Sequence, residues 1–475
     1  MVFSSVVFLF IFLPFTLIVH SFLSPKIRNF FLLLVSLLFY FWGENYLTLL
    51  ILISILFNYF GGILIGKLQK DSPGTSKLAL IIFIILNLGI LVYFKYSHFI
   101  IENINRLGFI NAVDNPIIHL PVGISFYTFH IMSYLIDVYR KDAIPQKKPF
   151  DLGLYIFLFP QLVAGPIIRY KDISQKIASR YVLGIDFTEG SIRFIRGLAK
   201  KVIIANTMAV VADNVFANPT GYMPAPVAWI GIICYTLQIY FDFSGYSDMA
   251  IGLGKMLGFN FPENFNYPYI AKSIQEFWQR WHISLSTWFR DYLYIPLGGS
   301  KLGHYKTYRN LFIVFFVTGL WHGASWNFIA WGLFHGAFLI IERIGFKQIL
   351  KKLPAFLQHF YTLFVIILGW VFFRAWNFKY AIKYLISLLG LGHSNDYSPF
   401  IQIEYYSIFI FILAIIFSTK IRVIIENKIK ELFATRTFFQ NINIVVGYLF
   451  YMMVLIYCAI ELAQNNYNPF IYYRF

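Results

Sequence analysis

The sequence predicts an all-α protein that crosses a membrane many times, and three observations carry this prediction. Of the 475 residues, 59% are hydrophobic, and the mean hydropathy is +0.65. Only 13% are charged, which is too few to cover the surface of a soluble protein of this size. The hydrophobic residues also form runs about as long as a bilayer-spanning helix. A soluble enzyme and a disordered chain are therefore excluded.

The positive charge of the chain lies between these apolar runs. The 39 Lys and Arg residues, against 22 Asp and Glu, give a formal net charge of +17. A basic excess can indicate nucleic-acid binding, but its placement here matches the enrichment of Lys and Arg in cytoplasmic loops of membrane proteins. We therefore expect no nucleic-acid partner. Cys234 and Cys458 lie inside apolar runs, so neither a disulfide framework nor a metal site is expected.

The first apolar run, residues 2–22, lacks the basic start and the small-residue cleavage site of a secretory signal, so it is expected to stay as a span. Lys26 and Arg28 follow it, which places the N-terminus outside. Threading the later runs by charge predicts about 11 to 12 crossings with both termini extracytoplasmic. The later spans are expected at residues 30–42, 46–65, 78–94, 122–139, 202–216, 227–243, 308–320, 324–341, 356–373, 401–417 and 442–460.

This alternation fails at residues 152–168. The run should emerge outside, yet a dense positive cluster at residues 169–180 follows it. We therefore expect a re-entrant segment, broken at Pro160 and at Gly165-Pro166. Irregular backbone at membrane depth is tolerated only where protein buries it or where it lines a wet cavity. A cavity on the cytoplasmic side is thus expected.

A single integral-membrane domain is expected over residues 1–475, because no soluble-domain linker or internal repeat interrupts the chain. Within it, residues 1–139 form N-terminal spans. Residues 140–345 form a core with re-entrant and amphipathic segments. Residues 346–475 form C-terminal spans and an extracytoplasmic tail.

The segment from Gln238 to Asp248 holds two carboxylates, two serines and a glycine at the end of an expected span. A charge at the bilayer centre costs about 2.5–3.5 kcal/mol, so such groups need partners or a function. Asp242, Ser244 and Asp248 either line a substrate channel or cap helix ends around Gly245, since Asp and Ser are common helix N-caps.

Residues 275–292 have the spacing of one amphipathic helix with two stripes. An aromatic stripe, suited to the headgroup level, consists of Trp278, Trp281, Leu285, Trp288 and Tyr292. A polar stripe on another face consists of Gln275, Gln279, His282, Ser286 and Arg290. The polar stripe predicts either a channel wall or an ordinary solvated face.

His322 is the sharpest polar signal. It stands in the stretch Gly319-Leu-Trp-His-Gly-Ala-Ser-Trp-Asn327, where two spans meet with almost no loop. It follows Arg309 by about 13 residues, which is about 20 Å of helix. Imidazole is the ionisable side chain least costly at such depth, because it is uncharged for much of the time at neutral pH and still accepts a proton. His335, on the next span, is expected to pack or to hydrogen-bond.

Five motifs in order along the chain resemble the bacterial membrane-bound O-acyltransferases. They are Pro121-Val-Gly-Ile-Ser-Phe-Tyr-Thr-Phe129, Phe159-Pro-Gln-Leu-Val-Ala-Gly-Pro166, the segment 238–248, Trp281-His-Ile-Ser-Leu-Ser-Thr-Trp-Phe-Arg-Asp291 and Gly319-Leu-Trp-His-Gly323. The opening Met-Val-Phe-Ser-Ser and the ending at residues 469–475 resemble the branch that contains alginate O-acetyltransferase and its peptidoglycan and cellulose relatives. The resemblance spans the chain and implies helices around a central channel.

The resemblance also implies a function. The invariant family histidine corresponds to His322, the expected general base, and the second family histidine to His282. Acetyl-CoA is implied as the cytoplasmic donor, and a polysaccharide outside a bacterial inner membrane as the final acceptor. A periplasmic acetyltransferase of the serine-hydrolase type is the implied partner. Tyr472 resembles a tail tyrosine that relays the acyl group; the alternative is a place in an interfacial aromatic belt.

Coenzyme A is large and polyanionic, so chemistry at mid-depth, reached by channels from both faces, is expected. His282 or Asn327 would orient groups or stabilise the oxyanion. Candidates for holding the phosphates, with ordinary cytoplasmic loop charge as the alternative for each, are Arg169, Lys171, Lys200, Lys201 and Arg280.

Two other functions stay open. D-alanyl transfer from a carrier protein to teichoic acid occurs in the same family and predicts no use of free acetyl-CoA. A polytopic lipid or glycan transporter would share the spans and the basic loops, but it needs no buried histidine and often contains internal repeats.

Overall fold

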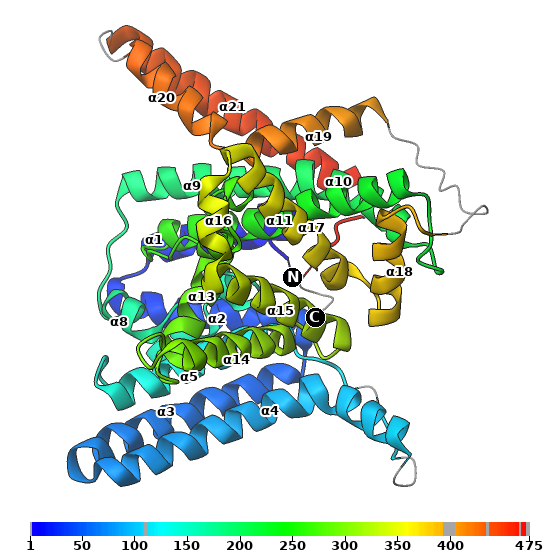
Figure 1. The fold of residues 1–475 in the computed structure, drawn as a ribbon. Coiled ribbons are helices and arrows are strands. Elements are labelled where there is room, and N and C mark those ends of the chain that lie inside the picture. Colours follow the sequence, from blue (N-terminus) through cyan, green and yellow to red (C-terminus); the bar gives the residue numbers. More distant parts are fainter. Residues whose placement is uncertain are drawn as a thin grey trace. The chain divides into compact units, whose positions relative to one another are not determined.

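The computed structural model describes residues 2–108, 113–116, 118–392, 404–433, 437–464 and 467–471, and every regular element in these ranges is a helix (Figure 1). The predicted all-α class is confirmed. The chain divides into two compact units, one of Met1–Phe194 with Met249–Pro262 and one of Ile195–Asp248 with Glu263–Phe475. Helices α9 (Gly184–Ala199) and α11 (Ala225–Met256) each contribute to both units.

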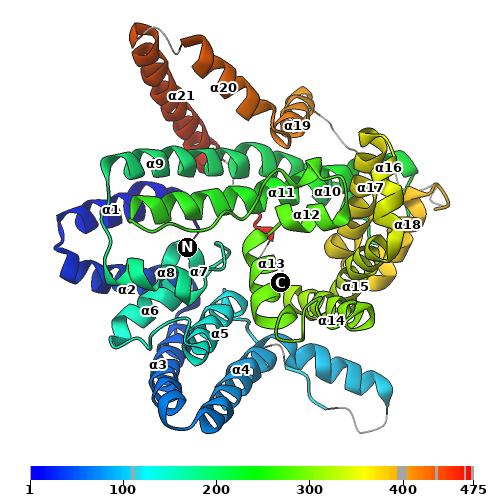
Figure 2. The same ribbon diagram turned by 60° about the vertical axis from the view of Figure 1, so that its left-hand side comes forward.

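The first unit contains a long helical hairpin of α3 (Leu47–Asp71) and α4 (Pro73–Leu107), drawn in blue and light blue (Figures 1 and 2). A proline stands at the first position of α4, where its missing N–H would have no helical partner anyway. The other helices that lie wholly in this unit are the π-helix η1 (Phe8–Phe12), α1 (Leu13–Phe22), α2 (Pro25–Glu44), α5 (Ile124–Arg140), α6 (Pro149–Phe157), α7 (Phe159–Leu162) and α8 (Tyr170–Ala178).

A reciprocal amide pair joins the two arms of this hairpin. The Asn58 amide donates to the side-chain oxygen of Asn87 at 3.0 Å, and the Asn87 amide donates back at 2.8 Å. Both side chains are buried. Polar pairs of this kind hold helices together in hydrocarbon, where the hydrophobic effect between helices is absent. The hairpin is therefore built for a lipid environment.

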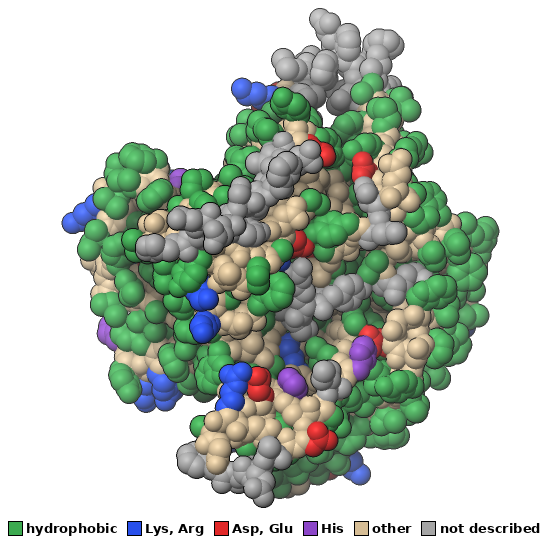
Figure 3. Space-filling model, turned by 90° about the vertical axis from the view of Figure 1, so that its right-hand side faces the viewer, with side chains coloured by type: hydrophobic (Ala, Val, Ile, Leu, Met, Phe, Trp, Pro, Cys, Tyr) green, Lys and Arg blue, Asp and Glu red, His purple; other side chains and the backbone are tan. Residues whose placement is uncertain are grey.

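Seven helices among the described residues are long and apolar enough to cross a membrane. They are Pro25–Glu44, Leu47–Asp71, Pro73–Leu107, Ala225–Met256, Trp326–Lys352, Ala355–Arg374 and Ile444–Gln464, and shorter apolar helices lie at Phe8–Phe22 and Tyr405–Phe417. On the face drawn in Figure 3, apolar side chains predominate over charged ones. The protein is thus a multi-pass membrane protein. The sidedness of its termini stays a prediction.

The segment expected to be re-entrant is buried throughout residues 151–168. The chain leaves the helix at Leu158, just before Pro160, and has no regular structure over residues 163–169. Gly165 is needed there, because a Cβ would lie 2.7 Å from the carbonyl oxygen of Pro160. The first break thus falls two residues before Pro160, which itself lies in the short helix α7, and the second break includes Gly165-Pro166 as expected. The path of this segment relative to a membrane stays a prediction.

The second unit holds the remaining helices (Figure 2). A π-helix, η2 (Lys200–Ala205), joins α9 to α10 (Asn206–Phe216). The later elements are a 3₁₀ turn η3 (Pro268–Ile270), α12 (Ile274–Arg280), α13 (Ile283–Phe289), η4 (Arg290–Tyr294), α14 (His304–His322), α15 (Trp326–Ile341), η5 (Glu342–Phe346), α16 (Lys347–Lys352), α17 (Ala355–Arg374), α18 (Phe378–Leu388), α19 (Tyr405–Phe417), α20 (Ile421–Phe433) and α21 (Thr437–Gln464).

Helix α11 corrects one prediction. The expected span ended at residue 243, with Gly245 as a break, but α11 continues to Met256. Gly245 instead permits close helix packing, since a Cβ there would lie 2.7 Å from the carbonyl oxygen of Gly197. Asp242 and Asp248 therefore lie inside a helix, and the interpretation of both as helix caps is wrong.

The spacing predicts one helix over residues 275–292, but this stretch is broken in the structure. The chain breaks between α12 and α13 at His282, whose φ of 44° is left-handed. Asn264 stabilises the break, because its carbonyl accepts from the Ile283 N–H at 2.9 Å and its side chain accepts from the Ser284 N–H at 3.2 Å. The aromatic stripe is also buried in protein rather than exposed on the surface, and its depth in a membrane stays a prediction. Its members Trp278, Trp281, Leu285, Trp288 and Tyr292 are all buried.

Candidate active site

His322 is the last residue of α14, where that helix turns directly into α15. Glycines let the two helices approach closely: a Cβ on Gly319 would lie 2.5 Å from the carbonyl oxygen of Phe328. Ser325 precedes α15 as its N-cap residue. This tight junction buries His322, which is 4% exposed.

A small, largely apolar cavity surrounds the imidazole. The His322 ring meets Trp331 edge-on at 4.8 Å between ring centroids, and Phe373 edge-on at 5.1 Å. Rings from α11, α15, α17 and the α12–α13 junction thus enclose the histidine. The cavity is lined by Ile239, Phe243, Trp281, His322, Trp331, Trp370, Phe373 and Ile471.

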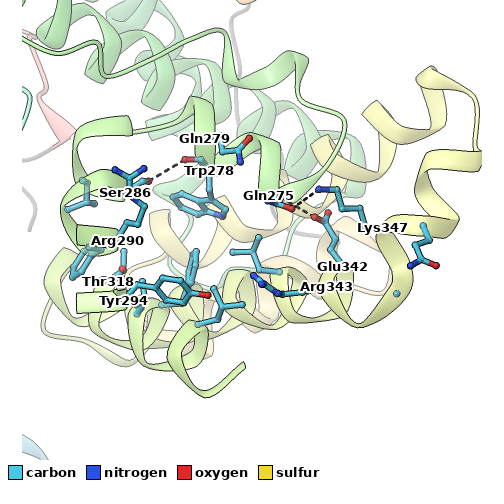
Figure 4. A pocket seen from close by; sticks show the side chains of 18 of the residues that line it. Gln275, Trp278, Gln279, Ser286, Arg290, Tyr294, Thr318, Glu342, Arg343 and Lys347 are labelled. Atoms are coloured by element: carbon cyan, nitrogen blue, oxygen red, sulfur yellow. Dashed lines mark hydrogen bonds between the residues drawn. The ribbon is translucent and has the colours of Figure 1, made fainter. Parts of the chain in front are cut away.

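A second, larger cavity of about 600 Å³ lies between α12, α13, α14 and the α15–α16 region (Figure 4). Four basic side chains and one carboxylate line it: Arg290, Arg343, Lys347, Lys351 and Glu342. Glu342 is held in place by the N–H groups of Ile274 at 2.6 Å and Gln275 at 3.1 Å, so it caps the start of α12. The deeper wall is apolar and aromatic. We call this space the basic pocket.

Two side chains connect the basic pocket to the surroundings of His322. Thr318 lines the pocket and precedes His322 on α14 by one helical turn. Trp278 lines the pocket and contacts Trp331 at 5.6 Å between ring centroids. Trp331 in turn contacts His322. Along this line of contacts, Trp278 and Trp331 therefore separate the pocket from the histidine.

The polar stripe lines the basic pocket with its members Gln275, Gln279, Ser286 and Arg290. His282 does not join them, because the left-handed turn at this residue directs its ring inward. Its Nδ1 is 3.1 Å from the Asn264 side-chain oxygen, and its ring meets Phe243 of the small cavity at 4.6 Å. Burial lowers the pKa of His282 to about 3, so the ring is uncharged at neutral pH.

The acidic residues of α11 form ion pairs with η2. Asp242 pairs with Lys201 at 2.8 Å, and Asp248 pairs with Lys200 at 2.6 Å. Ser244, which lies between the two aspartates in the sequence, is also buried. None of these residues lines the basic pocket. Lys201 was one candidate for a cytoplasmic basic rim, with ordinary loop charge as the alternative, but its side chain is 3% exposed and pairs with Asp242, so it does not belong to such a rim.

Asn327 ties two helices together. Its amide donates to the carbonyl oxygens of Phe372 at 3.2 Å and Ala375 at 2.9 Å, at the end of α17. Its side-chain oxygen accepts from the Ser325 hydroxyl at 2.5 Å. Asn327 lines neither the small cavity nor the basic pocket. Asn327 thus lies where α15 meets the end of α17, one helical turn before Trp331 of the small cavity.

The C-terminal segment reaches the small cavity. This contact joins distant parts of the chain, so no local pattern in the sequence predicts it. Ile471 is 5% exposed and lines this cavity together with His322. Its N–H donates to the Asp242 carboxylate at 2.9 Å. A lysine directly before one apolar run and an aspartate inside another, each needing a partner, were the signal that could have led to this contact. Tyr472, the expected acyl relay, lies outside the described residues.

Sequence comparisons with known proteins show which family this chain belongs to. The model of the membrane-bound O-acyltransferase family matches residues 143–390. The chain is also 44% identical over 398 residues to the probable alginate O-acetylase AlgI of Pseudomonas aeruginosa, covering 82% of this chain and 75% of that protein. The chain belongs to the membrane-bound O-acyltransferase family. The predicted family is therefore confirmed, and this acyltransferase contains the basic pocket and His322 within the matched range.

Two further relatives match different shares of this acyltransferase. The peptidoglycan O-acetyltransferase of Helicobacter pylori is 37% identical over 430 residues, covering 82% of this chain and 80% of that protein. The teichoic acid D-alanyltransferase of Streptococcus thermophilus is 31% identical over 248 residues, covering 46% of this chain and 56% of that protein. The likeness to the acetyl-transferring relatives thus extends over far more of the chain.

Proposed function

We propose that this acyltransferase passes an acetyl group from cytoplasmic acetyl-CoA to a polysaccharide outside a bacterial inner membrane. The observation that carries the proposal is the place of His322, buried between the basic pocket and the small cavity that the C-terminal segment enters. The relatives that match 82% of this chain are named for O-acetylation of alginate and of peptidoglycan, which supports a polysaccharide as acceptor.

The basic pocket suits the donor. Coenzyme A carries phosphates, and four basic side chains line this pocket. The charge pattern predicts that residues 343–352 lie on the cytoplasmic side. Deeper in the pocket, Trp278 and Phe315 offer an apolar wall to an acyl thioester arm. We therefore assign the phosphates to the outer part of the pocket and the thioester to the part near Thr318.

His322 then acts as general base. Its imidazole takes the proton of an acceptor hydroxyl, and the freed oxygen attacks the thioester carbonyl carbon. A C–O bond forms, the C–S bond breaks, and the departing thiolate takes the proton back from the imidazole. The aromatic rings around His322 exclude water, so hydrolysis of the thioester is disfavoured.

Tyr472 is the proposed acceptor hydroxyl. It follows Ile471, which lines the small cavity with His322, and adjacent Cα atoms are only about 3.8 Å apart. With the C-terminus extracytoplasmic, the acetylated tail would pass its group to a periplasmic acetyltransferase of the serine-hydrolase type. That partner would acetylate the polysaccharide. His282 would support the cavity through Phe243.

Deleting residues 471–475 is expected to abolish polysaccharide acetylation while the protein stays in the membrane, because the relay hydroxyl is lost. The measurement is the O-acetyl content of the polysaccharide made by cells that carry the deletion. Tyr472→Phe should reproduce the loss, and Tyr473→Phe is the matched control. Normal acetylation after deletion would overturn the relay.

Replacing Arg343 and Lys351 by Gln is expected to raise the KM for acetyl-CoA about tenfold with a smaller effect on kcat, since two contacts to phosphates are lost. The effect should shrink at high salt, which screens exposed charges. Initial rates with radiolabelled acetyl-CoA in inverted vesicles measure both constants. Lys306→Gln, exposed on α14 outside the pocket, is the control. An unchanged KM would contradict the donor assignment.

Family membership favours a transferase over the transporter alternative. D-alanyl transfer is the second candidate within the family, and the same vesicles distinguish it. A D-alanyltransferase would not turn over free acetyl-CoA, whereas the proposed enzyme would. Failure to turn over acetyl-CoA, together with transfer from a D-alanyl carrier protein, would overturn the proposal.

A further inference from the structure

The last described residues of the chain lie against one face of η2 and α10. The Tyr467 hydroxyl donates to the Asp213 carboxylate at 2.6 Å. The Asn206 amide donates to the Asn468 side chain at 3.4 Å, and the Lys201 ammonium donates to the Pro469 carbonyl. As the tail advances from residue 467 to 469, its partners recede from 213 to 201. The tail therefore runs antiparallel to the helix.

The π-helix explains why these partners share a face. Lys201 and Asn206 are five residues apart, which in an α-helix would turn them about 140° away from each other. Residues 200–205 instead form a π turn, in which residues five apart lie above each other. Asn206 and Asp213 are seven apart, which is about two turns of an α-helix. The π turn thus brings Lys201 into line with the other two partners.

The buried pair of Lys201 and Asp242 completes this arrangement. Their side chains are 3% and 1% exposed. The pair contacts backbone atoms of the tail on either side of Phe470: Lys201 bonds the Pro469 carbonyl, and Asp242 accepts from the Ile471 N–H. Phe470 itself stacks on Tyr246, with 4.8 Å between ring centroids. Buried ion pairs are stable only when further hydrogen bonds satisfy their remaining polar atoms, and the tail supplies two.

We propose that Lys201 and Asp242 are positioning residues that fix the register of the C-terminal segment at the cavity of His322. Both contacts are to the backbone on either side of Phe470, so together with the stacking of Phe470 on Tyr246 they hold Ile471 at the cavity. The inference rests on the proposed function, in which the residue after Ile471 carries the acceptor hydroxyl. Neither residue acts on the donor.

Two double variants test the role of the pair. Lys201→Met with Asp242→Leu removes the contacts without leaving a single buried charge, a kind of replacement that buried ion pairs often tolerate. Lys201→Asp with Asp242→Lys keeps a buried pair but reverses its donor and acceptor ends toward the tail. If the ion pair only holds the two helices together, exchanging its charges should leave the tail in place. If it positions the tail, the exchange should displace the tail, because the donor and acceptor that face the tail backbone are reversed.

The neighbouring pair supplies a matched control. Lys200 and Asp248 join the same two helices at 2.6 Å, and they line neither the small cavity nor the basic pocket. Lys200→Met with Asp248→Leu therefore removes an ion pair between η2 and α11 without touching the described tail contacts. This control should retain the tail position.

The position of the tail is measured independently of enzyme activity, from the reactivity of a cysteine introduced into it. Cys234 and Cys458, both buried, are replaced by Ala, and Ile471→Cys is introduced into the full-length chain in membranes. The introduced thiol should react slowly with a water-soluble maleimide, and at least tenfold faster in both Lys201–Asp242 variants. Acetyl transfer to the polysaccharide is measured in the same variants and should fall by at least tenfold.

The outcomes separate this inference from the proposed function. Unchanged labelling of the introduced thiol in the two variants, or rapid labelling in the parent, would overturn the positioning role. Faster labelling with unimpaired acetylation would support the positioning role and overturn the relay through Tyr472. Faster labelling with lost acetylation in the Lys201–Asp242 variants, and no faster labelling in the control, is the result that supports both.

Discussion

His322→Ala is expected to reduce acetyl transfer from acetyl-CoA by about 10²–10⁴-fold, the usual contribution of a general base. The physical reason is that no other side chain described at the small cavity can take up the hydroxyl proton: its remaining lining is Ile, Phe and Trp. Initial rates of label transfer in inverted vesicles provide the measurement. Acetyl-CoA binding should be retained, since His322 does not line the basic pocket.

His304→Ala is the matched control, because His304 begins the same helix but is exposed. His322→Gln provides a second variant that keeps a polar side chain of similar size within the aromatic rings, so loss of packing does not explain its effect. Thermal unfolding of each purified variant checks that the fold is retained. Label transfer at the parent rate in His322→Gln would remove His322 from the catalytic step.

Gly332→Val is expected to prevent correct folding, with a loss of roughly 3 kcal/mol or more in the free energy of unfolding. A Cβ at this position would overlap the carbonyl oxygen of Phe315 and lie 3.0 Å from the Cα of Gly319. Both obstacles are backbone atoms, which move only if α14 and α15 separate. The yield of monodisperse protein in detergent and its melting temperature measure the effect.

Gly89→Ala serves as the comparison for this substitution. Gly89 also lies inside a helix, α4, but a Cβ there meets nothing within 4 Å. Alanine has the higher helix propensity by about 1 kcal/mol, so this variant should melt at the parent temperature or above. A Gly332→Val protein that melts with the parent would show that α14 and α15 are not locked by this contact.

The sequence predicted the parts of this protein that depend on composition and local spacing. The apolar runs indicated helices, and His322 was recognised because it stands between two of them. The polar stripe of Gln279, Ser286 and Arg290 was seen from its spacing alone, and these residues line one pocket. Each of these signals is contained within a short stretch of chain.

The features that escaped prediction depend on contacts between distant residues. The break at His282 is held by Asn264, and the packing role of Gly245 depends on Gly197. Neither partner is visible in a local pattern, so the stretch 275–292 had the spacing of one helix and Gly245 resembled a break. The pairing of Lys201 with Asp242 likewise requires two helices to meet first.

The π turn at residues 200–205 has a consequence for how this protein can change in evolution. A π turn corresponds to an α-helix with one inserted residue. Deleting a single residue there would restore the α-helix and leave Lys201 and Asn206 four residues apart, which keeps them on one face of the helix. Among relatives, a helix that is one residue shorter here is therefore compatible with the same C-terminal segment, whereas an α-helix of unchanged length would turn Lys201 away from it.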